Sequence, residues 1–439
     1  MTDLYRGKLQ TAVEAASLIR SGDGIWLHSN AGVPRVLIDA MVARAAELRA
    51  VRIYQIITLG AAPYAAPQFA ESFQIQSLFI GPNTRQAVAE ARADYTPIFF
   101  SEISSLFRSG KLRVDVCLLQ CSPPDDEGNM SLGLAMDFTP AALTNARTII
   151  VEVNKQTPRT FGSHCINVRD VHAVVEADYA PPERIEEAPG EIELEIGRHV
   201  ARLVEDGATI QMGIGAIPNG VLQALGDKRD LGVHSEMVSD GVIDLIDRGV
   251  INGSKKTVLP GKVAVAFIFG SKRLYEFVHN NPTIEFHPTD FINDPYVISQ
   301  NYKMTSINSA LQVDLTGQVC ADSIGPNLYS GFGGQVDFVR GARRSKGGKA
   351  IIALPSTAKN GKVSRITPML LSGSGVVTTR ADVQWVVTEY GAVDLHGMNI
   401  RDRVTSLISI AHPSFRAELE DRAHESFSWS VGKTRDCVR

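Results

Sequence analysis

Short apolar runs alternate with helical segments along most of this chain. The runs are rich in β-branched residues, and they include residues 24–27, 51–57, 114–119, 148–153, 171–175, 209–212, 263–269, 350–354 and 383–388. Segments with helical periodicity lie between them, among them residues 11–19, 36–47 and 140–145. Because parallel strands are joined through a crossover that is usually a helix, this alternation predicts an α/β fold with largely parallel sheets.

One break in composition suggests where the chain divides. A length of 439 residues is enough for two or three domains of about 150 residues each. Prolines and a run of acidic residues gather at 178–190, and a helical pattern begins at Glu191. We therefore expect two α/β domains, residues 1–185 and 190–439. A surface loop within a single domain is the alternative interpretation of residues 178–190.

Charge and composition exclude several classes of protein. Lys plus Arg number 44 against 48 for Asp plus Glu, a net charge of −4, and charges of both signs are scattered along the chain, which argues against a nucleic-acid-binding surface. No apolar run approaches the roughly 18 residues that span a bilayer, and residues 1–10 lack a signal pattern. The ten histidines show no metal-ligand spacing, so no metal site is expected.

The five cysteines include no CxxC pair and lie mostly in apolar runs, which is typical of reduced core residues in a cytoplasmic protein. His234 is interpreted as a strand-end histidine rather than a general base, and Lys255 with Lys256 as a solvated charged turn.

A glycine-containing segment, Gly213-Ile214-Gly215-Ala216-Ile217, follows the expected strand at 209–212 and precedes a helical stretch. Glycines at such a turn let a ligand approach the backbone, whose N–H groups favour anions. The segment has neither the GxGxxG spacing of dinucleotide folds nor the GK[ST] of a P-loop, so NAD and Walker-type ATP binding are rejected. A tight turn without a ligand remains the alternative.

Two further segments carry candidate chemistry. Glu236 lies between small and apolar residues just after an expected strand end, a place from which a carboxylate can point into a cleft; a solvated surface glutamate is the alternative. Gly331, Gly333 and Gly334 lie within four positions, and such a turn can supply backbone N–H groups to an acyl oxygen. A purely structural turn is the alternative there.

Taken together, these segments resemble the class I coenzyme A transferases of the acetyl-CoA hydrolase/transferase family, which includes 4-hydroxybutyrate, butyrate and succinate CoA-transferases. The similarity covers nearly the whole chain. The motifs that carry it are residues 151–154, 158–160, 234–237, 240–241, 306–310, 313–318, 331–334, 355–359, 364–366, 388–391 and 410–413.

The resemblance implies a fold of two α/β domains and a role for several residues. Glu236 matches the nucleophile, the N–H of Gly334 matches a group that holds the thioester oxygen, and Asn308 matches a polar residue of the active site. CoA is expected to contact Gly213, Ile214, Gly215, Ala216, Ile217, Gly331, Gly333 and Lys359. Glu389 resembles a second acid near the site.

The activity implied is transfer of CoA from acetyl-CoA or succinyl-CoA to a short-chain carboxylate of four or five carbons, through a glutamyl-CoA thioester. The small residues at 28–35 and 59–62 are candidates for the wall of the acceptor pocket. The acyl-CoA thioester would be a substrate, with no tightly bound cofactor, and a homodimer or homotetramer is expected by analogy. Two alternatives stay open: an acyl-CoA hydrolase that uses the same glutamate, and a non-catalytic CoA-binding protein.

Overall fold

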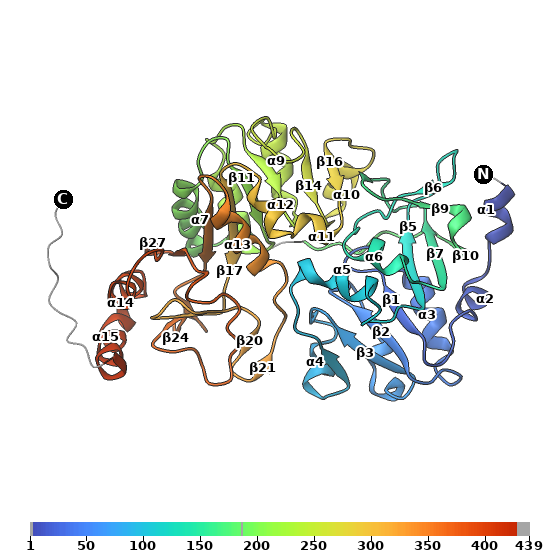
Figure 1. Ribbon diagram of the computed structural model, residues 1–439, viewed down its shortest axis with the longest axis horizontal. Helices are drawn as coiled ribbons and strands as arrows, with labels where there is room; N and C mark the ends of the chain where they lie inside the picture. The colour runs from blue at the N-terminus through green and yellow to red at the C-terminus, as the bar shows by residue number, and fades with distance from the viewer. Residues whose placement is uncertain (1–2, 186–187, 428–439) are drawn as a thin grey trace.

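The computed structural model describes residues 3–185 and 188–427, which form two large sheets that lie side by side (Figure 1) and four small sheets of two or three strands. The first sheet has seven parallel strands. Their spatial order is β10 (Ala173–Ala177), β7 (Thr148–Asn154), β5 (Val116–Cys121), β1 (Gly24–Leu27), β2 (Val51–Gln55), β3 (Phe73–Ser77) and β4 (Ala93–Tyr95). This confirms the predicted parallel α/β architecture.

Both faces of the first sheet are covered, which explains why its strands are apolar runs rather than alternating patterns. Along β1, Ile25 and Leu27 belong to one hydrophobic cluster and Trp26 belongs to the other. The helices of this half are α1 (Asp3–Lys8), α2 (Ala12–Ala16), α3 (Arg35–Ala43), α4 (Arg85–Ala89), α5 (Phe100–Arg108) and α6 (Thr139–Leu143). Side chains of α3 fill the first cluster, and Phe100 and Phe107 of α5 fill the second.

The second sheet is larger and includes one strand from the first half of the chain. Its order is β27 (Gly391–Asp394), β26 (Trp385–Thr388), β22 (Lys349–Ala353), β17 (Met304–Ser309), β11 (Thr209–Met212), β12 (Gly232–His234), β14 (Val263–Val265), β16 (Ile284–Phe286) and β8 (Phe161–Gly162). Neighbours along this order are parallel except β26 and β27. The short strands β13 (Met237–Val238) and β15 (Phe267–Ile268) join beside β11.

Nine helices accompany the second sheet within the described part of the chain. They are α7 (Glu191–Leu203), α8 (Ala216–Ala224), α9 (Gly241–Asp247), α10 (Lys272–Val278), α11 (Thr289–Ile292), α12 (Pro295–Ser299), α13 (Gln335–Arg344), α14 (Ile400–Ser409) and α15 (Pro413–Phe427). The predicted helix start at Glu191 is confirmed.

Each sheet reverses its winding direction at one pair of neighbouring strands. The chain runs from β1 outward through β2, β3 and β4, and then from β5 outward the other way; likewise β12 and β14 follow β11 on one side, whereas β22 and β26 follow β17 on the other. Ligands of open α/β sheets bind at the carboxyl ends of strands at such reversals. The crevice between β11 and β17 is therefore a favoured binding position.

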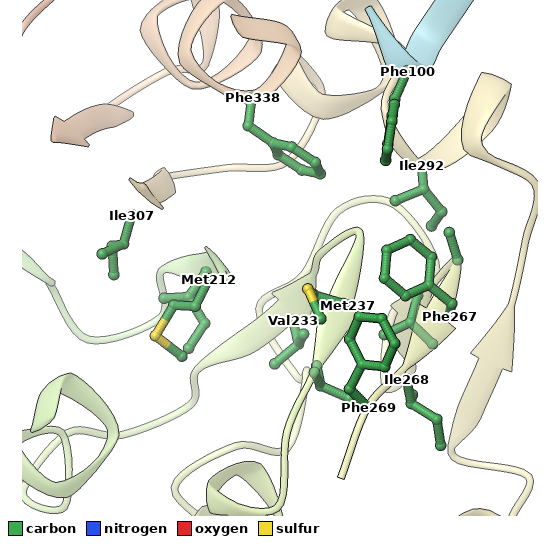
Figure 2. Packing of buried hydrophobic residues seen from close by; sticks show 14 of the residues in the cluster. Phe100, Met212, Val233, Met237, Phe267, Ile268, Phe269, Ile292, Ile307 and Phe338 are labelled. Atoms are coloured by element: carbon green, nitrogen blue, oxygen red, sulfur yellow. The ribbon is translucent and has the colours of Figure 1, made fainter. Parts of the chain in front are cut away.

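The two halves share one continuous hydrophobic cluster. Phe100 of α5 belongs to the same cluster as Ile292 and Phe338 of the second half, and Figure 2 shows these three side chains gathered near Met237 and Phe267. The sheets are nonetheless drawn from separate stretches of chain except for β8. The domain boundary near residues 178–190 stays a prediction.

Several sequence expectations need correction. The run at 263–269 is two strands, because the N–H groups of Ala266 and Phe267 both donate to the carbonyl of Glu236 and interrupt the ladder. Lys256 is only 3% exposed and is not a solvated turn residue. Cys165 is exposed, whereas Cys117, Cys121 and Cys320 are buried free thiols; Cys437 lies outside the described residues.

Within residues 3–185 and 188–427, no helix combines the length and the apolar character that crossing a membrane requires.

Candidate active site

Glu236 lies in the two-residue gap between β12 and β13, at the carboxyl end of β12. Its backbone is fixed on one side by the two N–H groups of Ala266 and Phe267, which donate to its carbonyl at 3.0 and 3.1 Å. On the other side, the N–H of Ser235 donates to the carbonyl of Ala264 at 3.0 Å. The side chain is partly buried, so the alternative of a solvated surface glutamate is wrong.

Two donors hold the carboxylate of Glu236. Asn293 Nδ2 donates to Glu236 Oε2 at 2.8 Å, and the backbone N–H of Gly334 donates to the same carboxylate. A β-carbon at position 334 would lie 2.3 Å from Glu236 Oε2 and 2.2 Å from Asn293 Nδ2, so any other residue there would displace both side chains. The structure thus brings together the two residues predicted to act as nucleophile and oxyanion donor.

The environment of Glu236 disfavours its charge. The pKa of Glu236 is raised to about 7, chiefly by burial and also by the nearby carboxyl of Asp337, while the bonds from Asn293 and Gly334 oppose the rise. A carboxylate with a raised pKa is a stronger base and nucleophile once it is ionised, and it titrates in the neutral range.

The predicted glycine turn and Asn308 lie on the two sides of the crevice between β11 and β17. Gly213, Ile214 and Gly215 follow β11 directly, and Asn308 lies near the end of β17. Asn308 and Gln211 exchange side-chain hydrogen bonds of 3.1 and 3.3 Å across the two strands. These residues therefore occupy the position where an open α/β sheet binds its ligand.

The turn at 213–217 also has the geometry of an anion-binding helix start. Residues 213–217 are all partly exposed, and Gly215, with φ of 109°, adopts a backbone that strongly favours glycine as the chain enters α8. Ala216 and Ile217 form the first turn of α8. The N–H groups of such a first turn have no partner within their own helix, so they favour an anion.

The turn containing Gly331 and Gly333 packs against the first half of the chain. Gly331 lies against Phe79 and Tyr95, where a β-carbon would be 3.0 Å from a Phe79 ring atom, and the carbonyl of Gly333 accepts a 3.2 Å bond from the N–H of Phe100. Close approach between the two halves therefore explains why residue 331 is a glycine. Gly331 and Gly333 are both buried.

Two other predicted residues are not brought into contact with Glu236. Lys359 is exposed, and its side-chain ammonium has no hydrogen-bond or ion-pair partner among the described residues. Glu389 accepts bonds from the N–H and hydroxyl of Ser356 at 2.9 and 2.6 Å, at the ends of β26 and β22. Glu389 directly follows β26 on the same edge of the sheet as the crevice, whereas Lys359 follows the short strand β23 (Thr357–Ala358), which belongs to a separate two-stranded sheet.

His234 is fully buried, with Nε2 2.9 Å from the carbonyl oxygen of Ile292. Burial lowers its pKa to about 3, so it is neutral at pH 7. This agrees with the interpretation as a strand-end histidine. In the loop proposed as a pocket wall, His28, Ser29 and Asn30 are also buried, and Asp137 bonds to Ser29 and Asn30.

Three residues of this site were not singled out from the sequence. Asn293 follows α11, Asp337 lies in α13 and Ser101 lies in α5. These elements are far apart in the chain, and the three residues gather around Glu236 only in three dimensions. Asp337, three residues after Gly334, was the only one of them next to a recognised motif.

Both halves of the chain are similar to known proteins. Residues 2–185 match the acetyl-CoA hydrolase/transferase N-terminal domain, and residues 270–423 match the corresponding C-terminal domain. The chain is 48% identical over 425 residues to a 4-hydroxybutyrate coenzyme A transferase of Clostridium kluyveri, covering 97% of this chain and 99% of that protein.

Solved structures show the same fold. RipA from Yersinia pestis superposes with a TM-score of 0.91 at 36% identity, covering 96% of this chain and 98% of that one. A 4-hydroxybutyrate CoA-transferase from Porphyromonas gingivalis gives 0.83 at 40% identity, covering 97% and 99%. With both halves matched and relatives aligned over nearly their full length, this chain belongs to the acetyl-CoA hydrolase/transferase family.

Proposed function

We propose that this protein is a CoA-transferase that moves CoA from acetyl-CoA or succinyl-CoA to a carboxylate of four or five carbons, with Glu236 as the nucleophile. One observation carries the proposal: a partly buried carboxylate is held by the N–H of Gly334 at the carboxyl end of β12, next to the β11–β17 crevice. The transferases found among its relatives support the same activity.

In the first half-reaction, a carboxylate oxygen of Glu236 attacks the thioester carbonyl of the donor. The new C–O bond forms as the C–S bond breaks, which gives an acyl-glutamyl anhydride and CoA thiolate. The thiolate then attacks the side-chain carbonyl of Glu236 and releases the donor acid, leaving a glutamyl-CoA thioester. This is covalent catalysis with ping-pong kinetics.

In the second half-reaction, the acceptor carboxylate attacks the glutamyl thioester and displaces CoA thiolate, which then attacks the acceptor carbonyl of the new anhydride. Glu236 leaves as a carboxylate. Donor, enzyme and acceptor groups are all carboxylates, so the steps are nearly isoenergetic and the thioester energy is retained without ATP.

The N–H of Gly334 changes partner during this sequence. Before substrate binds, it donates to Glu236. To hold the thioester oxygen in the tetrahedral intermediate, as we propose, it must leave that carboxylate. Loss of one such donor lowers rates by about 10²-fold to 10³-fold in enzymes generally.

CoA is proposed as a substrate that enters beside the turn at residues 213–217, with Gly331, Gly333 and Lys359 as further contacts and with no tightly bound cofactor. The support is the crevice at the winding reversal and the first turn of α8, which favours a phosphate group. Asn308, with its amide presented beside the same crevice, is proposed as a polar group of the active site.

We propose an acceptor larger than acetate, such as 4-hydroxybutyrate, butyrate, succinate or itaconate, because the loop at 59–62 contains three small residues, 60–62, of which 60 and 61 are exposed. The proposal requires kcat/KM for these acids to exceed that for acetate. An equal or higher value for acetate would remove it.

The test of the activity combines two measurements. Acyl-CoA should leave a CoA-sized adduct on the native protein but not on Glu236→Ala, which excludes a non-catalytic CoA-binding protein. Acyl transfer to a carboxylate and release of free CoA are then followed together. Transfer much faster than release identifies a transferase, and release that ignores added carboxylate identifies a hydrolase.

We further propose that the enzyme works in the cytoplasm as a homodimer or homotetramer. The buried free thiols Cys117, Cys121 and Cys320 suit a reducing compartment. Light scattering on the full chain measures the number of subunits, and a monomeric mass would contradict this part of the proposal.

A further inference from the structure

A pocket of about 340 Å³ lies along the partly exposed side of α13. That helix runs from the Gly334 turn back to the start of β22, so its last residues reach the amino ends of the parallel strands. The segments before β26 and after β27 reach the same edge, because β27 is antiparallel to β26. The pocket therefore lies at the edge of the second sheet opposite to Glu236. It is lined by Arg340, Arg343, Arg344, Asp382, Gln384 and His396.

Positive charge exceeds negative charge in this pocket. Three of its six lining residues are arginines and only one of the six is an acid. Arg340 Nε and Nη2 bond to the two oxygens of Asp382, both at 3.2 Å, whereas no described residue bonds to the side chain of Arg344. A larger pocket beside α8 and α9 has two arginines and two aspartates, and Arg273 pairs there with Asp244. The pocket beside α13 differs from it in its excess of cations.

Arg343 is held in place by neutral groups. Its guanidinium donates to the carbonyl of Ala381 at 2.5 Å and lies 2.9 Å from His396 Nδ1. Because a guanidinium has no acceptor, Nδ1 of His396 accepts this bond and the proton of the neutral ring is on Nε2. Neither partner is negatively charged, so both fix the position of the Arg343 guanidinium without neutralising it.

The positive charge extends behind the wall of the pocket. Arg403 of α14 is only 9% exposed, and it donates to the carbonyls of Thr316 and Arg380. Burial lowers the pKa of Arg403, and the charges of Arg343 and Arg380 lower it further. These guanidinium groups repel one another, and an anion in the pocket would relieve that repulsion.

The neutral residues of the lining also present donors. Gln384 Oε1 accepts from the N–H of Ala350 at 2.9 Å, which leaves the NH2 group of the amide as a donor. His396 offers Nε2–H. The neighbouring acid Asp394 accepts from the N–H of His396 at 3.0 Å. Donors from α13, from the segment before β26 and from the turn after β27 thus meet in one concave site.

We propose that this pocket binds the phosphate group of a small ligand, with Arg343 and Arg344 as its principal contacts. The volume is within the range of small-molecule sites, about 300–1,000 Å³. A phosphate monoester has three acceptor oxygens and close to two negative charges, and the planar fork of arginine matches its geometry. The proposed CoA turn at 213–217 follows β11 at the opposite edge of the sheet, so the two ligands can bind at once. This proposal goes beyond the proposed function and does not depend on it.

Calorimetric titration of the full-length protein with inorganic phosphate, pyrophosphate and AMP tests the proposal. The three probes separate free phosphate, a diphosphate and a nucleotide as the source of the group. We expect saturable binding of at least one probe, with an affinity that falls at least about 10-fold in Arg343→Gln and in Arg344→Gln. Arg344→Lys keeps the charge and should lose less. Phosphate bound at residues 213–217 would persist in these variants and is thereby counted separately.

Arg422→Gln is the matched control. It removes the same charge from α15, where Arg422 bonds to Glu425 at 3.0 Å, and it should bind the probes as the native protein does. Arg344→Gln should also keep the native kcat/KM, because the pocket and Glu236 lie at opposite edges of the sheet. A fall in kcat/KM for Arg344→Gln would contradict that separation.

The contrary results are specific. The absence of saturable binding to the native protein, or dissociation constants that are unchanged in both Arg343→Gln and Arg344→Gln, would overturn the proposal. Citrate that binds at this site as tightly as the best phosphate probe would contradict phosphate as the ligand class. If Arg343→Gln does not fold, the Arg344 variants decide. Binding is measured without acyl-CoA, so failure of the proposed function would leave this test intact.

Discussion

The backbone of Gly334 meets the carboxylate of Glu236 so closely that a β-carbon would lie 2.3 Å from Glu236 Oε2. We predict that Gly334→Ala lowers kcat/KM by about 10²-fold to 10³-fold, because the methyl group displaces the nucleophile and disturbs the N–H donor. Gly7→Ala is the control, since nothing lies within 4 Å of a β-carbon there. Steady-state kinetics on both variants checks this prediction. Unchanged kinetics in Gly334→Ala would contradict the placement of Gly334 in the active site.

The activity should depend on pH through Glu236. Only the carboxylate attacks, and burial together with the charge of Asp337 raises the pKa of Glu236 to about 7. We therefore expect kcat/KM for the acyl-CoA donor to fall as pH decreases below about 7. The measurement is a profile from pH 5 to 9 at constant ionic strength. If kcat/KM instead fell only near the ordinary pKa of a carboxyl group, the environment of Glu236 would not perturb its pKa.

The same environment lowers the stability of the folded protein when Glu236 is ionised. Its pKa is raised from 4.5 to about 7 in the folded protein, so the stability that Glu236 contributes in its protonated form is lost as pH rises through about 7. Glu236→Gln is neutral at every pH. We expect it to stabilise the protein by about 1–3 kcal/mol at pH 8 and by much less at pH 5. Thermal unfolding at the two pH values measures the difference, and an effect independent of pH would be the contrary result.

Tyr179 ties the beginning of residues 178–190 to the first sheet. Its hydroxyl bonds to Glu152, accepts from Gln120 Nε2 at 2.6 Å and from the N–H of Arg35 at 3.1 Å. Tyr179→Phe removes all of these bonds, including the one to the buried carboxyl of Glu152, which should cost about 1–3 kcal/mol. Tyr302→Phe, at an exposed ring whose hydroxyl bonds to no described residue, should cost little. Comparison of the two unfolding midpoints tests whether the Tyr179 hydroxyl stabilises the fold. Equal midpoints would count against that role.

The sequence predicted the parts of the fold that depend on local pattern. The strands at 24–27 and 209–212 were found with the same bounds, because runs bounded by turn residues and buried on both faces have a strong local signal. The partner of Phe161–Gly162 was not predictable in this way. That strand pairs with β16, more than 120 residues later, and two residues carry no periodicity.

The site was predicted to the extent that it lies in glycine turns and in the motif around Glu236. Asn293 and Asp337 were missed because their role depends on which neighbours they meet, and those neighbours come from α5 and from the β12–β13 gap. Lys256 shows the same limit. A lysine beside another lysine is usually solvated, but here Nζ donates to the carbonyl of Lys262 at 3.0 Å inside the fold, where burial lowers its pKa to about 7.

The most direct test of the central claim is the location of the covalent adduct. The native protein and Glu236→Ala are incubated with acyl-CoA, reduced with borohydride or digested, and the peptide that contains residue 236 is analysed by mass. We predict a modification on Glu236 of the native protein and an unmodified peptide from the variant. A CoA adduct of equal amount on Glu236→Ala, or one located on another residue of the native chain, would contradict the assignment of Glu236 as the nucleophile.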